Sequence, residues 1–130
     1  MRQILVAALL VMLAGCTSYA GLRDLPIAKS ETFRVGYEQL GHCILEGLRL
    51  TVQTFGYTSA IRPEKKTYRI AAEFKTLLGT PGVGFAWEVA VMQGSPSDSK
   101  VEARSLSTIW GTPSYPSEAV WGIVHECAKG

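Results

Sequence analysis

The chain has 130 residues, of which 47% are hydrophobic, and this length suits one domain with a modest core. Thirteen Lys and Arg oppose eleven Asp and Glu, which gives a formal charge of +2, and the basic residues form no run or stripe. A nucleic-acid-binding protein needs a concentrated positive surface, so we expect no nucleic-acid partner.

Residues 1–15 predict an export signal. Arg2 precedes an unbroken apolar run over residues 4–14, and small residues lead to the first cysteine. A helix needs about 20 apolar residues to cross the hydrocarbon core of a membrane, and this run is shorter. The pattern is typical of a secretory signal peptide, which is removed during export.

The end of this segment, Leu13-Ala14-Gly15-Cys16, resembles the lipobox of bacterial lipoprotein precursors at all four positions. The resemblance covers only this N-terminal stretch. It implies cleavage after Gly15, a diacylglyceryl thioether on Cys16 and an acylated new N-terminus. Cys16 would then anchor the protein to a membrane, because several acyl chains at about 0.8 kcal/mol per buried methylene hold far more firmly than one chain. The alternative is an ordinary secreted protein in which Cys16 has no such role.

The residues after Cys16 bear on the destination of the protein. In the lipoprotein family the inner-membrane retention signal is commonly Asp at the next position, so Thr17 implies the outer membrane, and we expect the domain to face the periplasm. Residues 16–30 show no sustained periodicity and contain Gly21 and Pro26. We therefore expect a lipidated N-terminus and a flexible tether over 16–30, followed by a single domain over 31–130.

Hydrophobic periodicity within 31–130 predicts two helices that flank a run of strands. The expected elements are a short strand over 32–35, a helix from Tyr37 to about Gly56, strands over 57–61, 67–75, 85–93 and 100–110, and a second helix whose apolar face carries Val120, Ile123, Val124 and Cys127. This order favours an α+β fold, a two-layer sandwich in which two helices cover one face of an antiparallel sheet of three to five strands.

Two features of these elements carry further expectations. Gly41 and Gly47 each cost the first helix about 1 kcal/mol relative to Ala, which suggests close packing against a sheet or another helix. The sheet face that points away from the helices is expected to be solvated, because its charges have mixed signs. Those charged residues are Arg69, Glu73, Lys75, Glu88, Glu102 and Arg104.

Cys43 and Cys127 remain once Cys16 is lipidated. An exported domain folds in an oxidising compartment, so we expect these two cysteines to form a disulfide. We expect each of them on the buried side of its helix. The bridge would close a loop of about 84 residues and stabilise the fold by about 4 kcal/mol.

A metal site built from His42, Cys43, His125 and Cys127 is the alternative use of these residues. Adjacent residues on a helix diverge by about 100° and residues two apart by about 200°, whereas helical ligand pairs favour spacings of three or four. A Cys-His nucleophile meets the same divergence, and the chain has no Gly-x-Ser-x-Gly motif. We therefore expect no metal, no cofactor and no catalytic residue, and partly exposed histidines.

Aromatic residues supply the remaining candidates. Trp87 is expected in the core, whereas Trp110, Tyr115 and Trp121 are candidate contacts to a partner, because exposed aromatic rings anchor protein interfaces. Partial burial at the end of the sheet is the alternative for these three. From the sequence we expect a membrane-anchored envelope lipoprotein, not an enzyme, that acts as an accessory or interaction module for another envelope protein or component. The alternative function is a small periplasmic hydrolase or a metal-handling protein.

Overall fold

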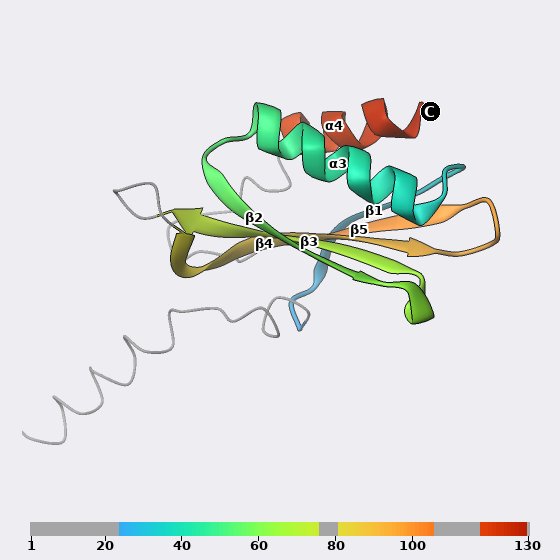
Figure 1. Cartoon of the computed structure of the whole chain (residues 1–130), viewed down its shortest axis with the longest axis horizontal. Helices are drawn as coiled ribbons and strands as arrows, with labels where there is room; N and C mark the ends of the chain where they lie inside the picture. The colour runs from blue at the N-terminus through green and yellow to red at the C-terminus, as the bar shows by residue number, and fades with distance from the viewer. Residues whose placement is uncertain (1–23, 76–80, 106–117, 130) are drawn as a thin grey trace, which may run out of the picture.

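The computed structural model describes residues 24–75, 81–105 and 118–129, which form one sheet covered on one face by two helices (Figure 1). The signal segment and Cys16 lie outside the described residues. In chain order the elements are β1 (Ile27–Phe33), α3 (Tyr37–Thr51), β2 (Phe55–Arg62), the short 3-10 helix η1 (Pro63–Lys65), β3 (Thr67–Lys75), β4 (Pro81–Gln93), β5 (Ser99–Ser105) and α4 (Glu118–Ala128). The predicted α+β sandwich is confirmed.

All five strands belong to one antiparallel sheet with the order β1-β5-β4-β3-β2. Strands β2 to β5 are neighbours in both sequence and space. Strand β1 instead pairs with β5, so α3 must carry the chain across the sheet from one edge to the other (Figure 1). Strands β1 and β2 are therefore the two edges of the sheet.

The core lies between the sheet and the helices, where the alternation of the strands places the larger apolar side chains. Tyr68 and Ile70 of β3 and Trp87 of β4 are buried there, and Trp87 is only 1% exposed. The facing row of α3 contains Leu40, Ile44 and Leu48, each fully buried. These residues recur at the three- and four-residue spacings of one helix face, so a single stripe of α3 covers the middle of the sheet.

Both glycines that were expected to mark close packing lie at helix contacts. A Cβ added at Gly41 would lie 2.8 Å from Cδ1 and Cδ2 of Tyr68, and one added at Gly47 would lie 2.6 Å from Cγ2 of Ile123 in α4. A side chain at either position would therefore push α3 away from β3 or from α4.

Replacement of Gly41 in α3 and of Gly122 in α4 by alanine should change the free energy of unfolding in opposite directions. Gly41→Ala is expected to destabilise the protein by about 1–2 kcal/mol, since the clash with the Tyr68 ring outweighs the gain in helix propensity. Gly122→Ala in α4 is the matched control, because a Cβ there meets nothing within 4 Å; we expect it to stabilise by up to about 1 kcal/mol. Urea unfolding of the two variants would measure both changes, and equal effects would contradict this packing.

The boundaries of two elements differ from the sequence expectation. Strand β1 begins at Ile27, four residues before the predicted start of the domain, so residues 27–30 belong to the sheet rather than to a tether. Helix α3 ends at Thr51, and Phe55 opens β2 opposite Phe74 instead of continuing the helix. The position of Phe55 fits the apolar spacing of the helix and also the start of a strand. Its pairing with Phe74 on β3 places it in the strand.

The sheet face that points away from the helices was expected to be solvated, and this prediction was wrong for its centre. Glu88 is 1% exposed and Glu102 is 9% exposed, and Ala71 and Ala90 are fully buried between them and their neighbours. The Nη1 atom of Arg69 donates a hydrogen bond of 2.6 Å to Oε1 of Glu88. This pair joins neighbouring strands and keeps a positive charge beside the buried carboxylate of Glu88, while the Arg69 side chain stays 21% exposed.

Candidate functional site

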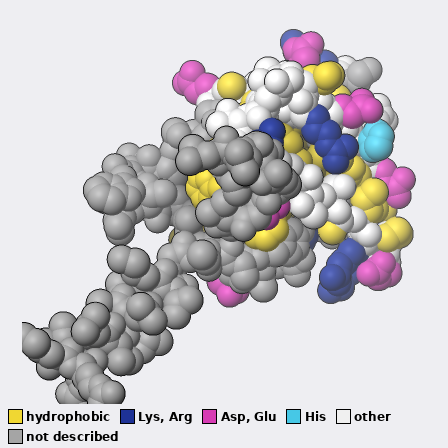
Figure 2. All heavy atoms as spheres, turned by 60° about the vertical axis from the view of Figure 1, so that its left-hand side comes forward, with side chains coloured by type: hydrophobic (Ala, Val, Ile, Leu, Met, Phe, Trp, Pro, Cys, Tyr) yellow, Lys and Arg dark blue, Asp and Glu magenta, His cyan; other side chains and the backbone are white. Residues whose placement is uncertain are grey.

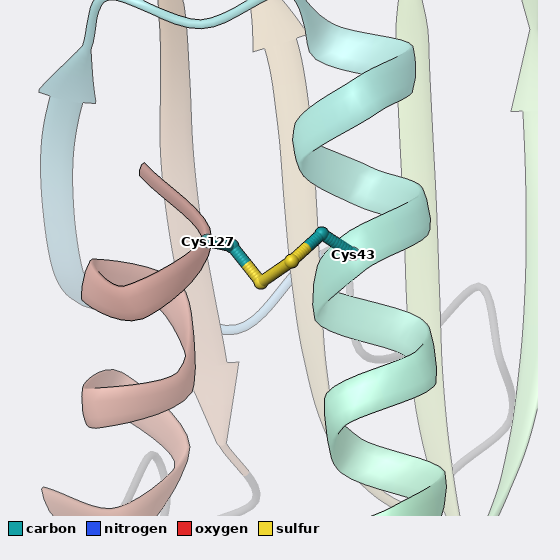
Figure 3. Close-up of a disulfide and its surroundings, with 2 residues drawn as sticks. All are labelled: Cys43 and Cys127. Atoms are coloured by element: carbon teal, nitrogen blue, oxygen red, sulfur yellow. A yellow bond between two sulfur atoms is a disulfide. The ribbon is translucent and has the colours of Figure 1, made fainter. Parts of the chain in front are cut away.

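Cys43 of α3 and Cys127 of α4 form a disulfide, with their Cα atoms 5.7 Å apart (Figure 3). The expected pairing is therefore present. The expected burial was wrong for Cys43, which is exposed, whereas Cys127 is partly buried and packs against the core. The two helices lie side by side on the sheet, so residues that face the neighbouring helix sit at the flank of each helix rather than on its sheet side. Gly47 and Ile123, one turn away from the cysteines, form the adjacent contact of this seam.

The two histidines beside the cysteines have separate surroundings. Nδ1 of His42 lies 3.5 Å from the hydroxyl of Tyr68, and its Nε2 lies 3.9 Å from Glu46. The side chains of His42 and His125 are 69% and 49% exposed, which confirms their predicted partial exposure. Within the described residues, no three His, Cys, Asp or Glu side chains are placed to hold a metal ion.

His125 belongs instead to a cluster that joins α4 to β1. Oε2 of Glu31 lies 2.9 Å from Nε2 of His125 and accepts a hydrogen bond of 3.0 Å from Nε1 of Trp121. The Phe33 ring meets the His125 ring edge-on, with centroids 5.4 Å apart. Nζ of Lys29 lies 4.9 Å from the centroid of Trp121, a cation-π geometry.

This cluster changes the interpretation of Trp121. The ring is only 5% exposed and its indole N–H already has an acceptor within the chain, so the prediction that it contacts a partner is not supported. Trp110 and Tyr115, the other candidate contacts, lie outside the described residues. A His-Glu pair can orient a general base, but in the described part of the chain no hydroxyl or thiol is hydrogen-bonded to His125. The described contacts therefore make this cluster a clamp between α4 and β1.

A pocket of about 390 Å³ opens where α3 meets β2. It is lined by Arg49, Gln53, Phe55, Gly56, Tyr57 and Lys75. The Tyr57 hydroxyl donates to the carbonyl of Val52 at 2.6 Å, and Nζ of Lys75 donates to the carbonyl of Gln53 at 2.8 Å, so both bonds fix the turn that enters β2. Arg49 has no acidic partner among the described residues. Two cations beside aromatic walls can bind a carboxylate or another anion.

A smaller pocket of about 50 Å³ lies at the opposite end of β2. Its lining residues are Arg62, Lys65, Thr67 and Arg69. Lys66, in the turn between η1 and β3, adopts a left-handed conformation with φ of 49°, which reverses the chain and brings these basic residues together. Figure 2 shows one face of the whole molecule, on which Lys and Arg side chains (dark blue) lie among hydrophobic (yellow) and acidic (magenta) side chains.

The edge of β2 connects these two pockets. All eight residues of the strand pair with β3 in one uninterrupted register, and within the described residues no strand pairs with the other side. Thr58 and Ser59 are exposed, and Ile61 is 48% exposed. Sheet edges in natural proteins usually carry Lys, Pro or a bulge that prevents further pairing. The β1 edge has a register shift beside Lys29, whereas residues 55–61 of β2 have none of these features.

No helix in the described part of the chain is long and apolar enough to cross a membrane. No protein-family model matches the chain, and no curated protein matches it either. Among the described residues that the sequence singled out, Trp121 and His125 belong to the clamp and Cys43 and Cys127 form the disulfide seam. The edge of β2 and its two pockets were not predicted as a site. The one signal in the sequence was the basic turn Arg62-Pro63-Glu64-Lys65-Lys66, which follows the predicted strand over 57–61.

Proposed function

We propose that the protein is a lipid-anchored module of the bacterial outer membrane whose domain faces the periplasm and binds another envelope protein. The anchor part of the proposal rests on the Leu13-Ala14-Gly15-Cys16 pattern, and the outer-membrane part rests on Thr17. The binding part rests on one observation: among the described strands, none pairs with the side of β2 that points away from β3.

A free sheet edge supports a binding role because its backbone groups are strong and obligatory hydrogen-bond donors and acceptors. Every second residue of β2 directs its N–H and C=O away from β3, and an extended segment of a partner can satisfy these groups by strand addition. Main-chain bonds supply affinity in this mode, and the pockets beside the edge supply specificity. The clamp and the disulfide support this role by holding α4 against the rest of the domain, so that the sheet is rigid before binding.

The anchor is tested with two variants, one that replaces Cys16 and one that replaces Cys43 and Cys127 together. In cells fed an alkyne-labelled palmitate, we expect the wild-type protein to take up label and to sediment with outer membranes. Cys16→Ser is expected to lose the label and to appear in the soluble periplasmic fraction, because no acyl chain remains to hold it. The double variant Cys43→Ser/Cys127→Ser is the matched control and should keep the label. Label that survives Cys16→Ser would contradict the proposed anchor.

A further inference from the structure

The smaller of the two pockets lies at the turn that joins β2 to β3, and we call it the hairpin pocket. It is lined by Arg62, Lys65, Thr67 and Arg69, three cations and one hydroxyl. We infer that the hairpin pocket binds the dianionic phosphate group of a phosphate monoester. The inference goes beyond the proposed function, because it concerns a charged group on the face of the sheet and needs nothing of the outer side of β2.

The pairing of the strands puts three of the lining residues on one face of the sheet. Arg62 of β2 lies directly opposite Thr67 of β3, and Ala60 lies directly opposite Arg69. Directly paired residues share a face, and successive residues of a strand alternate between faces. Tyr68, between Thr67 and Arg69, is buried in the core under α3. The two arginines and the threonine therefore lie together on the face that points away from the helices.

Lys65 reaches the same pocket from the turn, and three hydrogen bonds fix the backbone of that turn. The N–H of Lys66 donates to the carbonyl of Pro63 at 3.1 Å, and its own carbonyl accepts from the N–H of Gln93 at 3.0 Å. The Thr67 hydroxyl donates to the carbonyl of Lys65 at 3.0 Å. The turn is thus tied to itself and to β4. The backbone that carries the cations is ordered before a ligand binds, which lowers the entropic cost of binding.

The charges of the hairpin pocket favour a dianion. Arg62 and Lys65 are exposed, and neither forms a salt bridge with a described carboxylate. Arg69 is neutralised by Glu88, which accepts from one of its guanidinium nitrogens and leaves the other N–H groups able to donate. Two positive charges therefore remain. A phosphate monoester carries a charge of about −1.5 to −2 near pH 7 and matches them, whereas a carboxylate or a phosphodiester leaves one cation uncompensated.

Glu64, the acidic residue of the turn, does not oppose this charge, because it is not among the lining residues. The pKa of the Tyr37 hydroxyl is raised first by its hydrogen bond to Glu38 and in smaller part by the nearby charge of Glu64. Tyr37 opens α3 and belongs to the core on the helix-covered side. Glu64 therefore lies toward α3, whereas the hairpin pocket opens on the other face of the sheet.

The volume of the hairpin pocket limits the ligand to one small group. The pocket holds about 50 Å³, whereas pockets that enclose a whole drug-sized molecule hold about 300–1,000 Å³. The phosphate group would occupy the pocket and the rest of the ester would extend out of it. Two sources present such a group, a soluble glycerol or sugar phosphate and a lipid whose headgroup is a phosphate monoester.

The test titrates full-length protein, purified in micelles of a non-ionic detergent, by isothermal titration calorimetry. The soluble probes are glycerol 3-phosphate, inorganic phosphate, dimethyl phosphate and acetate. We expect the first two to bind and the last two to bind at least about threefold more weakly, because each lacks the second negative charge. Binding should weaken with added sodium chloride, since exposed charges are screened by salt.

Lipid probes identify the source of the phosphate. Dihexanoyl phosphatidic acid presents a monoester headgroup, and dihexanoyl phosphatidylglycerol is its diester control with the same acyl chains. Tighter binding of phosphatidic acid than of phosphatidylglycerol would support a lipid source. Equal binding of these two lipids, together with binding of glycerol 3-phosphate, would support a soluble source.

Two substitutions locate the site. Arg62→Gln and Lys65→Gln should each weaken the binding of glycerol 3-phosphate by about two- to fivefold, as is typical of exposed ion pairs, and the double variant should lose detectable binding. Arg34→Gln is the matched control. Arg34 is an exposed arginine that follows β1, at the other edge of the sheet, and its loss should leave binding unchanged. Arg69 stays intact in every variant, because its loss would leave the buried Glu88 unpaired.

Four results would overturn the inference. They are absence of binding by both glycerol 3-phosphate and inorganic phosphate, equal binding of glycerol 3-phosphate and dimethyl phosphate, unchanged binding in a folded double variant, and an equal loss in Arg34→Gln. None of them bears on the proposed function, because the membrane anchor is tested by palmitate labelling and the β2 surface by crosslinking at Thr58.

Discussion

Replacement of both Cys43 and Cys127 by serine is expected to lower the free energy of unfolding by about 4 kcal/mol. The two residues are 84 positions apart in the sequence, so the bridge removes a large part of the conformational entropy of the unfolded chain. In the native state it also fixes α4, an eleven-residue helix that would be marginal in isolation. Urea unfolding of the full-length protein, followed by circular dichroism, measures the change.

A loss of this size is a large fraction of the total stability of a small domain, typically about 5–15 kcal/mol. Treatment of the wild-type protein with a reductant should therefore reproduce the effect of the double variant, and the same reductant should leave the double variant unchanged. A shift below about 1 kcal/mol in the double variant would contradict the account in which the bridge holds α3 and α4 together.

Arg69→Ala is expected to destabilise the protein by about 3 kcal/mol, although Arg69 belongs to a face that the sequence indicated as solvated. Glu88 is 1% exposed and its Oε1 depends on Nη1 of Arg69, while Oε2 has no hydrogen-bond partner among the described residues. Loss of the guanidinium leaves a buried carboxylate without its counter-ion, and such losses typically cost about 3–5 kcal/mol. Our value is at the lower end because the Arg69 side chain is 21% exposed.

Two further variants test whether the loss of stability in Arg69→Ala comes from the unpaired buried charge or from the removal of any surface cation. The double variant Arg69→Met/Glu88→Met should recover most of the loss, because it removes both charges and keeps the apolar volume. Lys100→Ala is the control for an exposed pair: Lys100 lies 3.3 Å from Glu102 and its side chain is 51% exposed, so we expect a change within about 0.5 kcal/mol. Equal losses for Arg69→Ala and Lys100→Ala in thermal unfolding would refute the buried pair.

The parts of the fold that could be predicted from the sequence are those with a strong local pattern. The strict alternation of β3 fixed its faces, and the spacing of Leu40, Ile44 and Leu48 fixed the buried stripe of α3. Gly41 and Gly47 were informative because a glycine inside a helix is costly unless a neighbour needs the space. The pairing of two cysteines followed from a predicted compartment rather than from any local pattern.

The features that the sequence did not predict depend on contacts between distant segments. Strand β1 lies at an edge and most of its residues are exposed, so it carries no apolar alternation that distinguishes it from a tether. Glu31 gains its role only when α4 brings Trp121 and His125 beside it, some 90 residues later in the chain. The burial of Glu88 likewise depends on its neighbours across the sheet, because a charged residue on a polar face usually points to water.

The candidate binding surface was missed for a related reason. The sequence indicated a strand over 57–61 and a basic turn after it, but strand order decides which strands become edges. Because α3 crosses the sheet, β2 is the last strand at one end of the order formed by the described strands. Arg49 and Lys75 are distant in sequence, and they line one pocket only because the end of α3 lies beside the start of β2.

Site-specific crosslinking in intact cells tests the central claim, that a membrane-anchored domain binds an envelope protein through β2. A photoreactive side chain would be placed at Thr58 on the β2 edge, and at Lys129 after α4 as the control position. We predict that Thr58 yields a product with an envelope protein, that mass spectrometry maps the crosslink to an extended segment of it, and that Lys129 does not yield this product. Absence of a product from Thr58 in correctly lipidated protein, or the same product from both positions, would contradict the account.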